Sequence, residues 1–159
     1  MSRLGGVAAG VFESPWKGAG GSNLAERVFS GFTISPVLRA NSSRPFNLLV
    51  GADINSDRHP TTDRPPGAGR NTGIGPNFWT FDLRLTRQFG LGEERNLQFV
   101  FEAFDLLNRT NFSSVNNTVG VIGPPFSLRA SSALSPSQAL AYTAALPRRE
   151  IQLGLRLNF

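Results

Sequence analysis

Residues 150–159 read Glu150-Ile151-Gln152-Leu153-Gly154-Leu155-Arg156-Leu157-Asn158-Phe159. Apolar side chains occupy every second position from Ile151 to Phe159, and polar residues or glycine occupy the positions between them. The side chains of a strand point alternately to its two faces, so this pattern predicts a strand with one apolar and one polar face. A helix would need apolar residues three and four positions apart, which this stretch does not have.

Similar segments recur along the chain, at about residues 4–14, 27–50, 77–89 and 95–108, before the last strand at 149–159. The third segment is the clearest of these, because apolar and polar residues alternate from Trp79 to Leu85. A short turn at 90–94 contains glycine and joins it to the next segment, which is typical of a hairpin. We therefore expect an all-β fold, an antiparallel meander of about five strands.

The connections between the predicted strands alternate in length. Those at 15–26 and 90–94 are short, whereas those at 52–76 and 109–147 are long. Outer-membrane barrels have short periplasmic turns and long extracellular loops, and long connections without structure of their own are uncommon in compact soluble domains. We therefore interpret the meander as a segment of a transmembrane outer-membrane β-barrel with long extracellular loops, in which Phe159 ends on the periplasmic side.

A short helix is expected inside the last long loop. Ser135-Pro136-Ser137-Gln138 fits a capping box with proline at the first helical position. The sequence therefore predicts a helix from Ala139 to Leu146, ended by Pro147.

The two faces of the strands have different expected environments. In a barrel, apolar residues such as Leu83, Phe99 and Leu155 face lipid. Arg84 and Glu102 then lie in a wet interior, where Arg84 supplies a counter-charge to carboxylates of neighbouring strands. The alternative is a secreted soluble β-sandwich that binds a glycan or a protein through its loops, and it requires the three apolar residues to be buried within the chain. Alternation fits both architectures, and the loop lengths favour the barrel.

The composition excludes several classes of function. The net charge is +5 and the pI is near 11.2, but the basic residues are dispersed rather than clustered on one stripe, so no nucleic-acid partner is expected. The absence of cysteine excludes disulfides, thiolate metal sites and cysteine nucleophiles. The single histidine, His59, leaves little room for a Ser-His-Asp arrangement. We expect no enzyme activity, no catalytic residue, no metal site and no cofactor.

Targeting and membrane-spanning segments are also not expected. No apolar run reaches the roughly 18 residues that a transmembrane helix needs. The first six residues do not begin a secretory signal peptide.

One loop segment has the oxygen ligands that calcium prefers. Asp53, Asn55 and Asp57 alternate as in the first half of an EF-hand loop, but that pattern then requires glycine and glutamate where this chain has Arg58 and Arg64. The EF-hand interpretation is therefore excluded. A looser calcium site that includes Asp63 stays open as an alternative to a solvated loop.

Two stretches of the sequence resemble a known family. The first includes Gly51-Ala52-Asp53-Ile54-Asn55-Ser56-Asp57, Asp63-Arg64-Pro65-Pro66-Gly67 and Gly69-Arg70-Asn71-Thr72-Gly73; the second is Glu102-Ala103-Phe104-Asp105-Leu106-Leu107-Asn108-Arg109-Thr110-Asn111-Phe112 with Val115-Asn116-Asn117. Together they resemble the end of a TonB-dependent receptor barrel, specifically the Oar-like branch whose members carry a carboxypeptidase-regulatory-like domain. The similarity runs from about residue 27 to 159, and the 102–112 run is its most specific part.

This resemblance implies an outer-membrane receptor or transporter component in the bacterial outer membrane. Its role would be that of a barrel wall and of a C-terminal assembly signal, here Leu153, Leu155, Leu157 and Phe159. The implied partners are outer-membrane lipid, the barrel-assembly machinery and the N-terminal barrel and plug segments.

The chain departs from the family in what it does not contain. It has no plug domain and no TonB-coupling segment, and its strands are about five of the roughly 22 in the parent barrel. We therefore expect the whole chain, 1–159, to be a C-terminal barrel segment, a fragment that does not transport alone.

Overall fold

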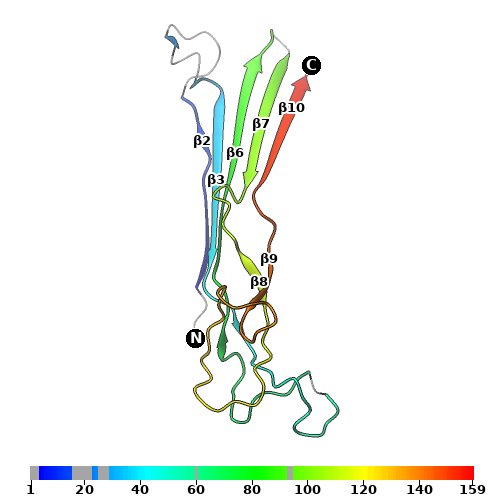
Figure 1. The fold of residues 1–159 in the computed structure, drawn as a ribbon. Helices are drawn as coiled ribbons and strands as arrows, with labels where there is room; N and C mark the ends of the chain where they lie inside the picture. Colours follow the sequence, from blue (N-terminus) through cyan, green and yellow to red (C-terminus); the bar gives the residue numbers. More distant parts are fainter. Residues whose placement is uncertain (1–3, 16–22, 25–28, 60, 93–94) are drawn as a thin grey trace. The chain divides into compact units, whose positions relative to one another are not determined.

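The computed structural model describes residues 4–15, 23–24, 29–59, 61–92 and 95–159 (Figure 1). Its strands are β1 (Gly5–Ala9), β2 (Phe12–Glu13), β3 (Phe32–Asn41), β4 (Pro45–Phe46), β5 (Gly73–Ile74), β6 (Phe78–Gly90), β7 (Asn96–Phe104), β8 (Phe112–Val115), β9 (Tyr142–Ala145) and β10 (Glu150–Asn158). The chain divides into two compact units, which are described separately below. The sheet unit comprises residues 6–39, 80–109 and 147–159, and the loop unit comprises residues 1–5, 40–79 and 110–146.

The long strands form one sheet in the order β1-β3-β6-β7-β10, and β2 also pairs with β3. Figure 1 shows β6, β7 and β10 side by side, as their pairing requires. The pairs β6–β7 and β7–β10 are antiparallel, with Leu85 opposite Phe101 and Leu155 opposite Phe99. The predicted all-β antiparallel class is therefore confirmed.

The N-terminal strands are more interrupted than the sequence indicated. The segment expected at 4–14 is divided into β1 and β2, and the break lies where the Gly10 amide donates to the carbonyl of Pro36 over 3.2 Å. Proline has no amide to offer a neighbouring strand, which accounts for an irregularity at this position. The segment expected at 27–50 is divided into β3 and β4, and its first two residues lie outside the described part of the chain.

The sheet unit has almost no hydrophobic core of its own. Among its described residues, Ala103 is the only buried apolar side chain, whereas Leu48, Val50, Ala130 and Ala141 are buried in the loop unit. Every residue of β10 is exposed. The apolar face of this sheet therefore lacks the internal partner layer that a soluble sheet requires.

The loop unit is an ordered structure made from both long connections, the first of which runs in the structure from Ser42, after β3, to Asn77, before β6. Leu49 pairs with Thr118, and Ile74 pairs with Arg129, each pair joining the first connection to the second. The Leu49 amide donates to the carbonyl of Asn117 over 2.9 Å, and its carbonyl accepts from the Val119 amide over 2.8 Å. The short pairs β4–β5 and β8–β9 also lie within this unit. The long connections thus satisfy much of their backbone by pairing with each other.

The helix expected at 139–146 is not formed. The Ser135 amide does bond to Oε1 of Gln138 over 2.8 Å, as a capping box would require. The chain then leaves the turn at Leu140, whose φ of 66° is left-handed, and continues as β9. Tyr142 stacks on Phe112 with ring centroids 4.2 Å apart. Pairing with β8 and this aromatic contact outweigh a weak local helix signal.

Candidate functional site

The last strand of the sheet is both apolar on one face and unpaired along one edge. β10 pairs with β7, and no other described strand lies beyond it. The exposed fraction is 69% for Leu153, 73% for Leu155 and 94% for Phe159. An edge of this kind presents a row of free backbone groups to another strand.

The residues expected to form the assembly signal are brought together on this strand. Leu153, Leu155 and Leu157 lie opposite Phe101, Phe99 and Leu97 of β7, so they share one face of the sheet. Asn158 lies opposite Asn96, which in turn lies opposite Gly90 at the end of β6. Phe159 therefore follows the strand at the same end of the sheet as the β6–β7 turn. Its role as an assembly signal stays a prediction.

The opposite face of the sheet carries paired charges. Arg39 of β3 forms an ion pair with Asp82 of β6. Nη1 of Arg84 lies 3.6 Å from Oε1 of Glu102, and the two residues are in register on β6 and β7. The counter-charge role predicted for Arg84 is therefore confirmed for Glu102, whereas Asp82 takes its counter-charge from Arg39. Each of these two carboxylates therefore has its own arginine as counter-charge.

One charge lies on the apolar side of β6. Arg87 follows Leu83 and Leu85 at the same alternating positions, and its guanidinium carbon is 4.8 Å from the ring centre of Phe32 and 4.6 Å from that of Phe89. Aromatic faces attract a cation electrostatically, which makes an arginine tolerable beside apolar neighbours.

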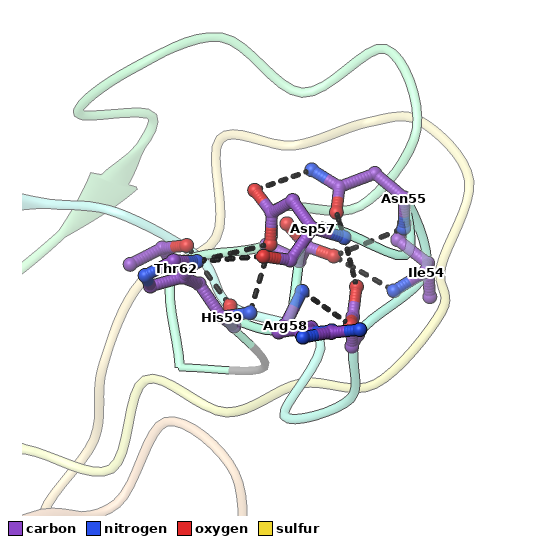
Figure 2. Close-up of polar contacts among 8 residues, drawn as sticks. Ile54, Asn55, Asp57, Arg58, His59 and Thr62 are labelled. Atoms are coloured by element: carbon purple, nitrogen blue, oxygen red, sulfur yellow. Dashed lines mark hydrogen bonds and ion pairs between the residues drawn. The ribbon is translucent and has the colours of Figure 1, made fainter.

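The acidic turn considered as a calcium site uses its oxygens on its own backbone (Figure 2). Asp53 accepts from the amides of Asp57 and Arg58, at 3.1 and 2.8 Å. Asp57 accepts from the His59 amide at 2.8 Å and from the Asn55 side chain at 3.0 Å. Asp63 is buried and accepts from the amide of Ile54 at 2.7 Å. Within the described residues, no group of three or more metal-binding side chains is positioned to hold an ion.

A polar cavity lies in the loop unit, and no pattern in the sequence indicates it. Its volume is about 550 Å³, and it is lined by Asn47, Leu49, Thr61, Thr62, Arg64, Arg70, Asn71 and Asn117. Asn117 comes from the second long connection, and the other lining residues come from the first. The cavity depends on pairing between segments far apart in sequence, which no local pattern reports.

Two further cavities have more apolar linings. One of about 450 Å³ lies in the loop unit among Phe46, Phe78, Phe112 and Leu146, with Arg44 at its wall. The other, of about 410 Å³, lies on the sheet unit among Phe12, Phe32, Ile34 and Leu85. Its lining belongs to the apolar face that also carries Arg87.

No helix in the described part of the chain is long and apolar enough to cross a membrane. A family model described as an outer membrane beta barrel domain matches residues 66–152. The matched segment contains the strands from β5 to β9 whole, the later part of the first long connection, all of the second and the first residues of β10. Comparison with curated proteins and with solved structures gives no match.

Proposed function

Because the chain belongs to the outer membrane beta barrel domain family and so to the bacterial outer membrane, we propose that it forms part of the wall of a TonB-dependent receptor barrel. In this proposal the β1–β10 sheet is wall, the loop unit is extracellular, and β10 with Phe159 directs assembly. The role is structural rather than catalytic and needs no cofactor or nucleic acid. The partners are outer-membrane lipid, the barrel-assembly machinery and further strands that close the barrel.

The exposed apolar face of β10 is the observation that supports this proposal most directly. Moving a large aliphatic side chain out of water is worth about 1.5–3 kcal/mol, so a row of exposed leucines in a soluble protein forgoes several kcal/mol of burial. Lipid supplies that burial in a membrane. The soluble sandwich would require Leu155 to be covered by the chain itself, yet 73% of this residue is exposed. This exposure argues against the sandwich alternative.

Extraction and gel migration of the full chain test the membrane role. We expect the expressed chain to stay with outer-membrane fractions until detergent is added, and to migrate differently in gels before and after heating once it is folded in lipid. A chain that is monomeric and soluble in plain buffer would contradict the proposal.

The finer assignment to TonB-dependent uptake is supported by the resemblance of the 102–112 run and the segments around Asp53 and Gly69 to such receptors. Sequencing the genomic DNA upstream of the Met1 codon tests it. We expect further strand-encoding sequence and a plug domain in the same reading frame. An independent promoter followed by an unrelated secretion signal would exclude the TonB-dependent assignment while leaving the barrel role intact.

A further inference from the structure

The polar cavity of the loop unit is rich in positive charge that the protein itself does not neutralise. Residues 42–79 and 110–146 contain five arginines (Arg44, Arg58, Arg64, Arg70, Arg129) and three acidic residues (Asp53, Asp57, Asp63). All three aspartates accept hydrogen bonds from backbone amides of the 53–63 turn. Within the described residues, the side chains of Arg64 and Arg70 form no ion pair with them. Among the described residues, two arginines without a carboxylate partner thus line one cavity.

The cavity also offers neutral hydrogen-bonding groups. Asn71, Thr61 and Asn117 line it together with the two arginines. The backbone amide of Asn71 donates to Oδ1 of Asn47 at 2.8 Å, which anchors the Asn71 backbone at the wall. Amides and hydroxyls of this kind suit the hydroxyl groups of a sugar, whereas a guanidinium suits the paired oxygens of a phosphate or carboxylate.

The wall is held by bonds that cross between the two long connections. The side-chain amide of Asn117 donates to the carbonyl of Asn47 at 3.0 Å, and the Leu49 amide donates to the carbonyl of Asn117 at 2.9 Å. The backbone of this wall is therefore already ordered before a ligand binds. Its volume of about 550 Å³ falls within the range of ligand pockets and exceeds what a bare inorganic anion needs.

We propose that this cavity binds an anionic saccharide, a sugar that carries a phosphate or carboxylate group, with Arg64 and Arg70 on the anionic group and Asn71, Thr61 and Asn117 on the hydroxyls. The site adds a binding function to the wall role and does not depend on the TonB-dependent assignment. The saccharide is either free in solution or the phosphorylated headgroup of lipopolysaccharide, because both present the same chemistry.

Titration of the full chain folded in detergent micelles tests the proposal. The probes are glucose 6-phosphate, glucuronate, uncharged glucose and inorganic phosphate, and binding is followed by calorimetry and by the NMR shifts of the Asn71 and Asn117 side-chain amides. We expect the two anionic sugars to bind more tightly than glucose or phosphate. Their binding should weaken as salt is raised, because partly exposed arginines are screened.

Variants separate the site from general positive charge. The pair Arg64→Gln with Arg70→Gln is expected to weaken glucose 6-phosphate binding about tenfold or more, since each charge-assisted hydrogen bond is among the strong ones. Arg58→Gln removes the same charge from an exposed arginine outside the cavity and is expected to leave binding within about twofold. The pair Arg64→Lys with Arg70→Lys keeps the charge without the planar fork and should retain binding only in part.

Bilayers distinguish the two sources of ligand. Vesicles of phosphatidylethanolamine with and without lipopolysaccharide are compared, and a shift of the Asn71 and Asn117 amides that requires both lipopolysaccharide and the two arginines identifies the lipid headgroup. Binding of free glucose 6-phosphate that is unchanged when lipopolysaccharide is added to the vesicles identifies a soluble sugar. The proposal is wrong if no anionic sugar binds, if glucose binds equally well, or if Arg58→Gln weakens binding as much as the cavity variants do. None of these results bears on whether the chain is a barrel wall.

Discussion

Gly51 has a left-handed backbone conformation and lies where the two long connections meet. Its φ is 78°, and a Cβ at this position would lie 2.6 Å from Cγ2 of Thr118, the residue paired with Leu49. Left-handed backbone costs an L-residue roughly 1–2 kcal/mol, before any steric contact is added.

We therefore expect Gly51→Ala to destabilise the loop unit by about 1 kcal/mol or more and to speed hydrogen exchange at the amides of Leu49 and Val119. Gly123→Ala is the matched control, because a Cβ there would meet no atom within 4 Å. Equal exchange rates in the two variants would show that the Leu49–Thr118 pairing does not depend on Gly51.

Asp63 holds the acidic turn by accepting backbone hydrogen bonds, and it is buried. Its Oδ2 accepts from the amides of Ile54 and Asn55 at 2.7 and 3.3 Å. Asp63→Ala leaves these amides without their acceptor, and we expect a loss of about 1–3 kcal/mol of loop-unit stability. Asp63→Asn keeps an acceptor oxygen and should lose less. The measurement is amide exchange at residues 54 and 55, and added calcium should not restore protection in Asp63→Ala.

The ion pair on the polar face could be predicted from the sequence, whereas the polar cavity of the loop unit could not. Arg84 and Glu102 both fall on the polar side of adjacent strands of a hairpin, so alternation alone places them near each other. The cavity forms because Leu49 pairs with Thr118, which brings two segments far apart in the sequence side by side. This pairing brings together the lining residues Arg64, Arg70 and Asn117. A pairing between irregular segments has no period in the sequence, and therefore no local signal.

The apolar and the polar face of β10 can be compared by introducing an arginine on each. Leu155 lies on the exposed apolar face, and Gln152 lies opposite Glu102 on the face that carries the ion pairs. An arginine on the lipid face near the bilayer midplane costs about 2–4 kcal/mol, whereas interior positions tolerate it.

We expect Leu155→Arg to lower the free energy of unfolding in lipid vesicles by about 2–4 kcal/mol. The folded fraction is measured by heat-modifiable migration across a urea series. Gln152→Arg adds the same charge to the same strand and should be close to neutral, because Glu102 is its register partner. A reversed order would mean that the faces have been assigned the wrong way round.

The C-terminal residue, Phe159, directly follows β10. Phe159 follows a strand whose outer edge has no described partner, and an edge of this kind can be recognised by strand addition with pockets for alternate side chains. We expect Phe159→Ala to reduce assembly into the outer membrane in cells severalfold while spontaneous folding into detergent is unchanged. Asn158→Ala, on the other face, is the control. Equal loss in both assays would indicate a packing role for Phe159 instead.

Whole elements were predictable where alternation is long and clean. β6, β7 and β10 lie within a few residues of their expected bounds, because each alternates over many residues and two of them are joined by a tight turn. The sequence predicts a helix where β9 forms, because the local capping signal is real but short and β9 is stabilised by pairing with β8. The break between β1 and β2 lies opposite Pro36 of the neighbouring strand. The sequence does not show that Gly10 pairs with Pro36, so the position of the break could not be predicted.

The whole molecule contains two units that are stabilised in different ways. The loop unit buries Leu48, Val50, Ala130 and Ala141, whereas among described residues the sheet unit buries one small apolar side chain, Ala103. The hydrophobic effect therefore acts inside the loop unit, but on the sheet it acts only when lipid or detergent covers the apolar face. Both kinds of unit contain ordered backbone hydrogen bonds, so secondary structure alone does not distinguish them.

This difference predicts how the folded chain responds when detergent is removed. Amides of the sheet, such as Gln88, which donates to Gly31 at 3.0 Å, should lose protection from hydrogen exchange as their apolar face meets water. The amides of Val50, Ile74 and Ala130 donate within the loop unit at 2.8, 2.7 and 3.0 Å and should keep protection longer, because the core around them does not depend on lipid. Exchange mass spectrometry on the same sample, before and after dilution below the micelle concentration, measures both sets. Simultaneous loss in both units would show that the loop core is not stable without the sheet, and retention in both would contradict the membrane role of the sheet.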